Sequence, residues 1–169
     1  MKPIRWLSRH EPGFRELSGR ERNAVMHFSL LWSLFESGAL NTNGNARAIV
    51  AAAKLWADEN LIAERAFHRQ LAHFRNRYHA NGAFTYRFEQ LGFRPHDRRA
   101  LVEQALGGDE ADPALVAAAV LIIVYRLRNN LFHGVKWADG IRGQLENFDH
   151  ANEALMQAIA LYRQWSVAQ

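Results

Sequence analysis

The chain has 169 residues and a formal net charge of +4, with 21 Lys and Arg against 17 Asp and Glu. It contains no cysteine, which excludes disulfides, thiolate nucleophiles and zinc sites built on Cys. The N-terminus lacks the apolar segment of a signal peptide, so we expect one soluble, cytoplasmic domain over 1–169. Eighteen of the basic residues are arginine. The arginine fork suits phosphate contacts, although a GC-rich genome produces the same bias.

The N-terminal third predicts an arm and two helices. Residues 1–17 contain two prolines and show no periodicity, so we expect an irregular N-terminal arm. Ser18 and Glu21 then have the spacing of a capping box, which predicts a helix that ends at Gly38. A second helix is expected over 46–57, after a turn.

The middle of the chain is less regular. Large apolar residues recur at helical spacing over 60–79, which predicts a third helix. Its other side carries basic and polar residues, and this face either follows a phosphate backbone or is simply solvated. The basic and polar residues are Arg65, His68, Arg69, Arg75, Asn76 and His79. Residues 83–88 alternate weakly like a strand without a partner. A short helix is expected from Arg94-Pro95 to Gly107-Gly108.

The most apolar stretch is 114–137, which reads ALVAAAVLIIVYRLRNNLFHGVKW. Its first twelve residues are Ala, Leu, Val, Ile or Tyr, which predicts a buried central helix. Asp112 and Pro113 mark its start and Gly134 its end. Twelve residues are fewer than the roughly 20 needed to cross a bilayer, so no membrane association is expected. With a last amphipathic helix after residue 140, the pattern predicts an all-α, up-and-down bundle of five to six helices.

The central helix ends in the sequence Arg128-Asn129-Asn130-Leu131-Phe132-His133. The same Arg-to-His spacing occurs in Arg5 to His10 and in Arg22 to His27, and this composition gives about one such pair by chance. Only the pair at 128 and 133 ends a buried helix. Arg, Asn and His in a last turn also stabilise a helix end, which is the structural alternative.

This sequence, RNNLFHG at the end of a long apolar helix, resembles the Arg-x4-6-His signature of the HEPN superfamily, in its Apea-like type. The resemblance implies a HEPN-like helical bundle and a metal-independent endoribonuclease in a toxin–antitoxin or phage-defence setting. It also implies a homodimer that brings two motifs into one cleft. Related toxins often carry a tyrosine two residues after the histidine, where an antitoxin attaches a nucleotide. Val135 occupies that position here, so neutralisation by that route is in doubt.

The residue types fit RNA cleavage. The expected catalytic residues are His133 as acid or base, Arg128 as the phosphate cation and Asn129 as an orienting group. Asn129 and His133 share a helix face, whereas Arg128 and His133 diverge by about 140°. They converge only if the helix unwinds near His133 or if a second copy supplies the missing half, and the HEPN resemblance implies the second copy. The expected partners are single-stranded RNA, a second copy and a protein antitoxin, with no metal and no cofactor.

Arg126, Lys136 and Arg142 lie near the motif and are expected to line an RNA-binding surface. A non-catalytic dimerisation or nucleotide- and RNA-binding module of the same fold is the alternative. A helix-turn-helix regulator is less favoured, because the arginines are spread along the chain.

Overall fold

The computed structural model describes residues 2–108, 112–133, 141 and 143–168. The chain forms an all-α bundle, as predicted, with a small two-stranded hairpin. The described residues form nine helices, more than the five to six predicted. The elements are α1 (Pro3–His10), α2 (Pro12–Glu16), α3 (Gly19–Gly38), α4 (Ala46–Asp58), α5 (His68–Tyr78), β1 (His79–Ala80), β2 (Ala83–Phe84), α6 (Tyr86–Glu89), α7 (Arg99–Gly107), α8 (Pro113–His133) and α10 (Leu145–Val167).

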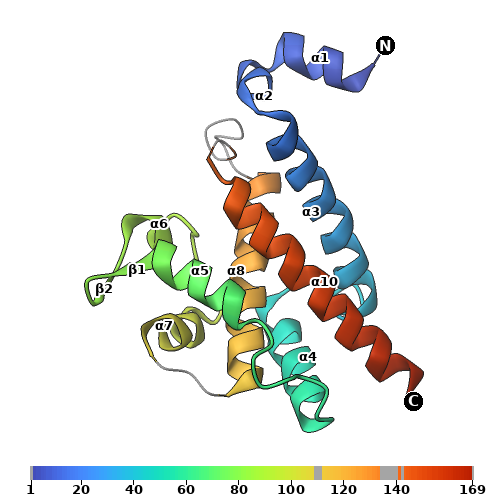
Figure 1. Ribbon diagram of the computed structural model, residues 1–169, viewed down its shortest axis with the longest axis vertical. Helices are drawn as coiled ribbons and strands as arrows, with labels where there is room; N and C mark the ends of the chain where they lie inside the picture. Colours follow the sequence, from blue (N-terminus) through green and yellow to red (C-terminus); the bar gives the residue numbers. More distant parts are fainter. Residues whose placement is uncertain (1, 109–111, 134–140, 142, 169) are drawn as a thin grey trace.

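Helix α8 forms the centre of the bundle and contacts α4, α5, α7 and α10 (Figure 1). Every residue over 116–127 is buried, which confirms the predicted central helix. The Asp112 carboxylate accepts a hydrogen bond from the Ala114 backbone N–H at 2.9 Å, and this supports the predicted start. The predicted stop at Gly134 lies outside the described residues.

Length alone does not distinguish α8 from a membrane span. Counted over Pro113–Phe132, the helix is long and apolar enough to cross a bilayer, unlike the twelve-residue run alone. However, 67% of its most apolar window is buried inside the bundle. The central helix of a globular bundle has the same composition, because it is surrounded by other helices instead of lipid.

Helices α3 and α10 lie side by side and run in the same direction (Figure 1). Near their starts the Asn152 amide donates to the Ala24 carbonyl at 3.0 Å. Near their ends Gly38 lies so close to the Tyr162 ring that an added Cβ would be 2.8 Å from it. The predicted capping box at the start of α3 is present in both directions, which fixes where this helix begins.

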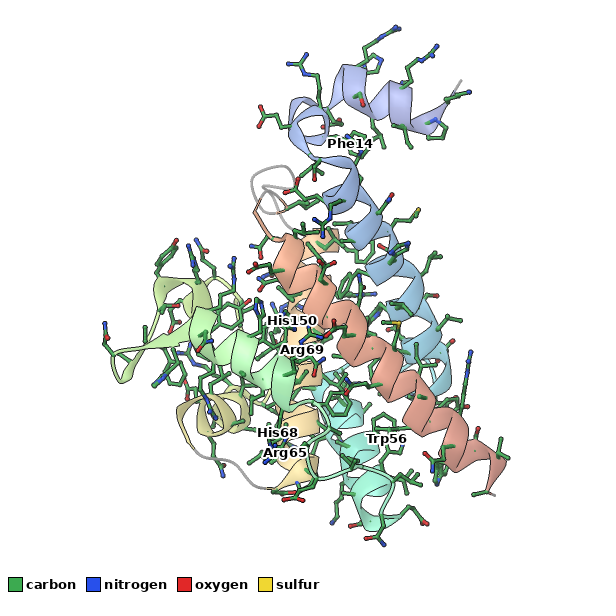
Figure 2. All side chains as sticks on the ribbon, viewed as in Figure 1. Phe14, Trp56, Arg65, His68, Arg69 and His150 are labelled. Atoms are coloured by element: carbon green, nitrogen blue, oxygen red, sulfur yellow. The ribbon has the colours of Figure 1, made fainter. Side chains whose placement is uncertain are left out.

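The prediction of an irregular arm over 1–17 is wrong. Pro3 and Pro12 each occupy the first position of a helix, where the missing N–H costs nothing, so they begin α1 and α2. Phe14 of α2 is buried, which ties α2 to the bundle (Figure 2). No residue of α1 is buried, and α1 projects beyond the N-terminal start of α3 (Figure 1).

The predicted helix over 60–79 is only half helical. Phe67 has a left-handed backbone with φ of +64°, so α5 begins at His68. The Phe67 side chain is 1% exposed, and burial of its ring outweighs the continuity of the helix. After α5, the weak strand signal over 83–88 is right only at 83–84, where Phe84 of β2 pairs with His79 of β1. The rest of it is wrong, because Tyr86–Glu89 forms helix α6. The helix expected from Pro95 begins instead at Arg99.

Candidate functional site

Arg128 lies near the end of α8, with a side chain that is 27% exposed. Its guanidinium lies over two aromatic rings, 5.7 Å from the centroid of Trp32 and 5.4 Å from that of Phe132. Arg128 Nη2 lies 3.8 Å from Glu36 Oε2, a carboxylate that also accepts from Trp32 Nε1 at 2.8 Å. Stacked aromatic rings and a loose ion pair therefore hold the Arg128 cation at the surface of the bundle.

Asn129 is buried, and its Oδ1 accepts a hydrogen bond from Arg128 Nη1 at 3.1 Å. Asn129 was predicted to orient His133 or a phosphate, and the structure brings it together with Arg128. His133 is the last residue of α8, and its side chain lies outside the described part of the chain. On an ideal helix position 133 is about 140° from position 128, so the divergence noted in the sequence persists in α8.

The expectation that Arg126 lines an RNA-binding surface is wrong. Its side chain is 4% exposed, and its Nη1 lies 2.7 Å from the equally buried Asp97 Oδ2. Its Nε and Nη2 donate to the carbonyls of Leu91 and Gly92 at 3.0 and 2.7 Å. Each of its three nitrogens has a protein partner, so Arg126 ties α8 to the 91–97 loop and leaves nothing for a ligand. The sequence could not show this, because an arginine near the polar end of a helix can face either solvent or the neighbouring segments.

Lys136 and Arg142, the other predicted RNA-binding residues, lie outside the described residues. The predicted basic face over 65–79 is divided among separate structural roles. Arg69 forms an ion pair with Glu153 of α10 at 3.0 Å. Arg75 donates to the carbonyls of Ala105, Leu106 and Gly108, and so holds the end of α7. Two of the six residues of this face, Arg69 and Arg75, therefore bind neighbouring helices.

Arg77, which the sequence groups with no site, lines a polar pocket of about 320 Å³ beside α8. Tyr86 and Arg87 of α6 and Asn130 of α8 lie on the same pocket. The sequence did not predict this pocket. Arg87 falls in a segment that alternates like a strand, and no other arginine lies three or four residues from Arg77 on its helix. No spacing rule connects residues on α5, α6 and α8.

His73 and His150 form a second cluster, between α5 and α10. Their rings stack with centroids 4.1 Å apart and planes 17° apart. His73 Nε2 lies 2.7 Å from Asn147 Oδ1, and His150 Nδ1 lies 3.8 Å from Glu153 Oε2. Burial, then the neighbouring His73, lowers the pKa of His150. Figure 2 shows His150 close to Arg69 in this view.

Within residues 2–108, 112–133, 141 and 143–168, no group of three or more His, Asp or Glu side chains is arranged to hold a metal ion. Comparison of the chain with known protein families, with curated protein sequences and with solved structures finds no match.

Proposed function

We propose that this protein is a metal-independent endoribonuclease of the HEPN type that acts on single-stranded RNA as a homodimer. The observation that carries the proposal is the position of the RNNLFHG motif at the end of the buried central helix. There Arg128 is partly exposed and held by Trp32 and Phe132. The motif follows directly on the buried part of α8 over 116–127, so the packed half of the helix sets where the motif lies.

The chemistry needs three functions. A base removes the proton of the ribose 2′-OH, an acid protonates the leaving 5′-oxygen, and a cation stabilises the crowded phosphate. Two copies of His133, one from each protomer, divide the first two roles, since the unperturbed pKa of histidine lies near neutrality. Arg128 stays protonated and offers two parallel donors to the phosphate, and Asn129 orients its guanidinium.

The outward face of α3 supports the two-fold assembly. Met26, Leu30 and Leu34 are spaced four residues apart, and each is more than half exposed. The sequence over 23–35 contains no Asp, Glu, Lys or Arg, in a protein where 22% of residues are charged. An uncharged apolar stripe is complementary to its own copy, because no like charges meet across a two-fold axis. A second copy bound at this stripe supplies the missing half of the site, since Arg128 and His133 diverge on one helix.

The alternative is a non-catalytic HEPN-like dimerisation or nucleotide-binding module. One observation favours it. The Glu36 carboxylate lies beside Arg128, and an arginine that only stabilises the fold has a carboxylate partner of this kind. In either case we place the protein in the cytoplasm. A toxin–antitoxin or phage-defence setting with a protein antitoxin follows the family resemblance, although Val135 removes the tyrosine that some antitoxins modify.

Product analysis tests the chemistry. Attack by the 2′-oxygen leaves a 2′,3′-cyclic phosphate on the 5′ fragment, whereas attack by water leaves a linear phosphate. Purified protein is incubated with a labelled single-stranded RNA, and the fragments are identified by mass. Cyclic phosphate supports the proposal, and linear phosphate from the outset contradicts it.

A further inference from the structure

The pocket beside α8 has walls from three helices and the segment before α10. Its polar lining residues are Arg77, Tyr86, Arg87, Gln90, Asn130 and Gln144. Asn130 Nδ2 donates to the Gln90 carbonyl at 3.0 Å, which holds the α6 wall against α8. The volume of about 320 Å³ lies at the lower end of the range for small-ligand sites, roughly 300–1,000 Å³. It fits one nucleotide unit better than a larger ligand.

The charges in this pocket are unbalanced. Of the residues that the structure describes, two arginines line it and no carboxylate does. Among the described residues, neither Arg77 nor Arg87 forms an ion pair, in contrast to Arg69, Arg99 and Arg126, each of which contacts an Asp or Glu. Both arginines lie close enough to Tyr78 to affect its ionisation. Burial raises the pKa of Tyr78 to about 12, and the charges of Arg77 and Arg87 oppose that rise. An anion is therefore the complementary ligand.

Arg77 also has unused hydrogen-bonding capacity. Its Nη2 donates to Gln144 Oε1 at 3.1 Å, but its Nε is buried without an acceptor in the described part of the chain. A buried N–H without an acceptor costs stability, so the guanidinium of Arg77 is incompletely paired at the wall of the pocket.

Tyr86 adds a stacking surface. Its side chain is 67% exposed, an unusual position for a large aromatic ring. The Arg87 guanidinium lies 5.6 Å from the Tyr86 ring centroid, and Arg87 Nε donates to the Tyr86 hydroxyl at 3.3 Å. An exposed ring next to an arginine is the combination that binds a base by stacking and the adjacent phosphate by charge.

Leu127 and Asn130 of α8 line the pocket, and Asn130 is the one nearer to position 133. On an ideal helix, positions 130 and 133 are about 60° apart, whereas positions 128 and 133 are about 140° apart. We propose that this pocket is a nucleotide subsite for single-stranded RNA beside the cleavage site, in which Arg77 and Arg87 bind a phosphate and Tyr86 stacks on a base. The choice of RNA over other phosphate ligands rests on the proposed function. Arg126 is buried and cannot bind a phosphate, so Arg77 and Arg87 of this pocket take the RNA-binding role that was expected of it.

Binding of a short 2′-O-methyl single-stranded RNA, which has no 2′-OH to attack, tests the subsite without cleavage. The probe is titrated with the whole 169-residue chain and followed by fluorescence anisotropy at several salt concentrations. The variants are Arg87→Gln, Tyr86→Ala and Tyr86→Phe. All three replace exposed side chains, so their folds are expected to persist, and circular dichroism checks this. Arg47→Gln, which removes an exposed arginine of α4 outside the pocket, is the matched control.

We expect Arg87→Gln to weaken binding roughly tenfold and to reduce the slope of log affinity against log salt by about 0.7. Tyr86→Ala is expected to weaken binding roughly 5- to 150-fold, and Tyr86→Phe to retain it, because the phenyl ring still stacks. Arg47→Gln is expected to match the wild type. Absence of wild-type binding, or equal affinities for Arg87→Gln, Tyr86→Ala and Arg47→Gln, would overturn the subsite. Pocket-dependent binding without cleavage of unmodified RNA would retain the subsite and reject the ribonuclease.

Discussion

The guanidinium of Arg126 lies 2.7 Å from the carboxylate of Asp97, and both side chains are buried. The same Asp97 oxygen accepts from the Arg94 backbone N–H at 2.8 Å. Asp97→Ala therefore leaves a buried arginine charge unpaired, and we expect it to lower the free energy of unfolding by about 3–5 kcal/mol. Urea denaturation followed by circular dichroism measures this change.

A double variant separates the ion pair from the packing around it. Replacing both partners by leucine removes the two charges together, so Asp97→Leu with Arg126→Leu is expected to be more stable than Asp97→Ala alone. A loss below about 1 kcal/mol for Asp97→Ala would show that water reaches Arg126, and would restore it as a candidate RNA ligand.

Glu36 is expected to weaken RNA binding by Arg128, since its carboxylate lies 3.8 Å from Arg128 Nη2. Glu36→Gln removes the charge but keeps an acceptor for Trp32 Nε1. Partly exposed pairs of this kind are worth up to about 1 kcal/mol, so affinity for 2′-O-methyl RNA should rise by up to about fivefold at low salt. Glu64→Gln, an exposed glutamate outside the site, is the control for general charge. Unchanged or weaker binding by Glu36→Gln relative to that control would separate Arg128 from the RNA.

The α3 stripe makes the homodimer testable. Leu30 is 61% exposed at the middle of the stripe, so Leu30→Asp is expected to leave the fold intact and to place two carboxylates opposite each other at a two-fold axis. Light scattering should then report a monomer where the wild type is a dimer, and RNA cleavage should fall with it. Val167→Asp, at an exposed position near the end of α10, should leave the dimer unchanged. A wild-type monomer at tens of micromolar, or a Leu30→Asp dimer, contradicts this assembly.

The stacked histidines predict loss of stability in acid. The folded state holds the pKa of His150 below its ordinary value of 6.5 through burial and through His73, with Glu153 and Glu146 opposing that shift and Arg69 adding to it. The unfolded chain therefore binds more protons as pH falls below about 6.5. This contribution to stability is complete above pH ~6.5 and is lost on acidification, so the melting temperature should drop between about pH 7.5 and 5.5. His150→Gln should reduce that drop, and an unchanged pH slope in the variant would assign it to other groups.

Sequence periodicity predicted the helices that are defined by local signals. The capping box at Ser18 and the apolar run over 114–125 each carry their own start signal, and both helices begin where these signals lie. Phe67 shows the limit of such reasoning, because its left-handed backbone and its buried ring are not signalled by the residues around it. Its backbone N–H donates at 3.3 Å to Gln157 Oε1 of α10, a helix from a distant part of the chain.

The candidate site was predictable to the same extent. The sequence predicted that the motif lies at the end of α8. It also predicted how the residues of the motif are arranged around that helix, because a helix fixes their relative positions. It could not separate the roles of Arg126 and Arg128, which are two residues apart and differ by about 160° around the helix. Asp97, Glu36 and Trp32 decide those roles, and all three come from other segments. The pocket of Arg77 and Arg87 is likewise a product of tertiary packing.

The central claim is that His133 acts in metal-independent RNA cleavage. Wild-type protein and His133→Ala are purified in parallel and incubated with unmodified single-stranded RNA in the presence of EDTA. Loss of a general acid or base costs roughly 10²–10⁴-fold in rate. Truncation at a helix end costs about 0.3–1 kcal/mol against a total stability of about 5–15 kcal/mol, so the variant should remain folded. We predict cleavage by the wild type and a loss of at least about 100-fold in folded His133→Ala. Equal cleavage by the two proteins, or none by either across varied RNAs, would contradict the claim.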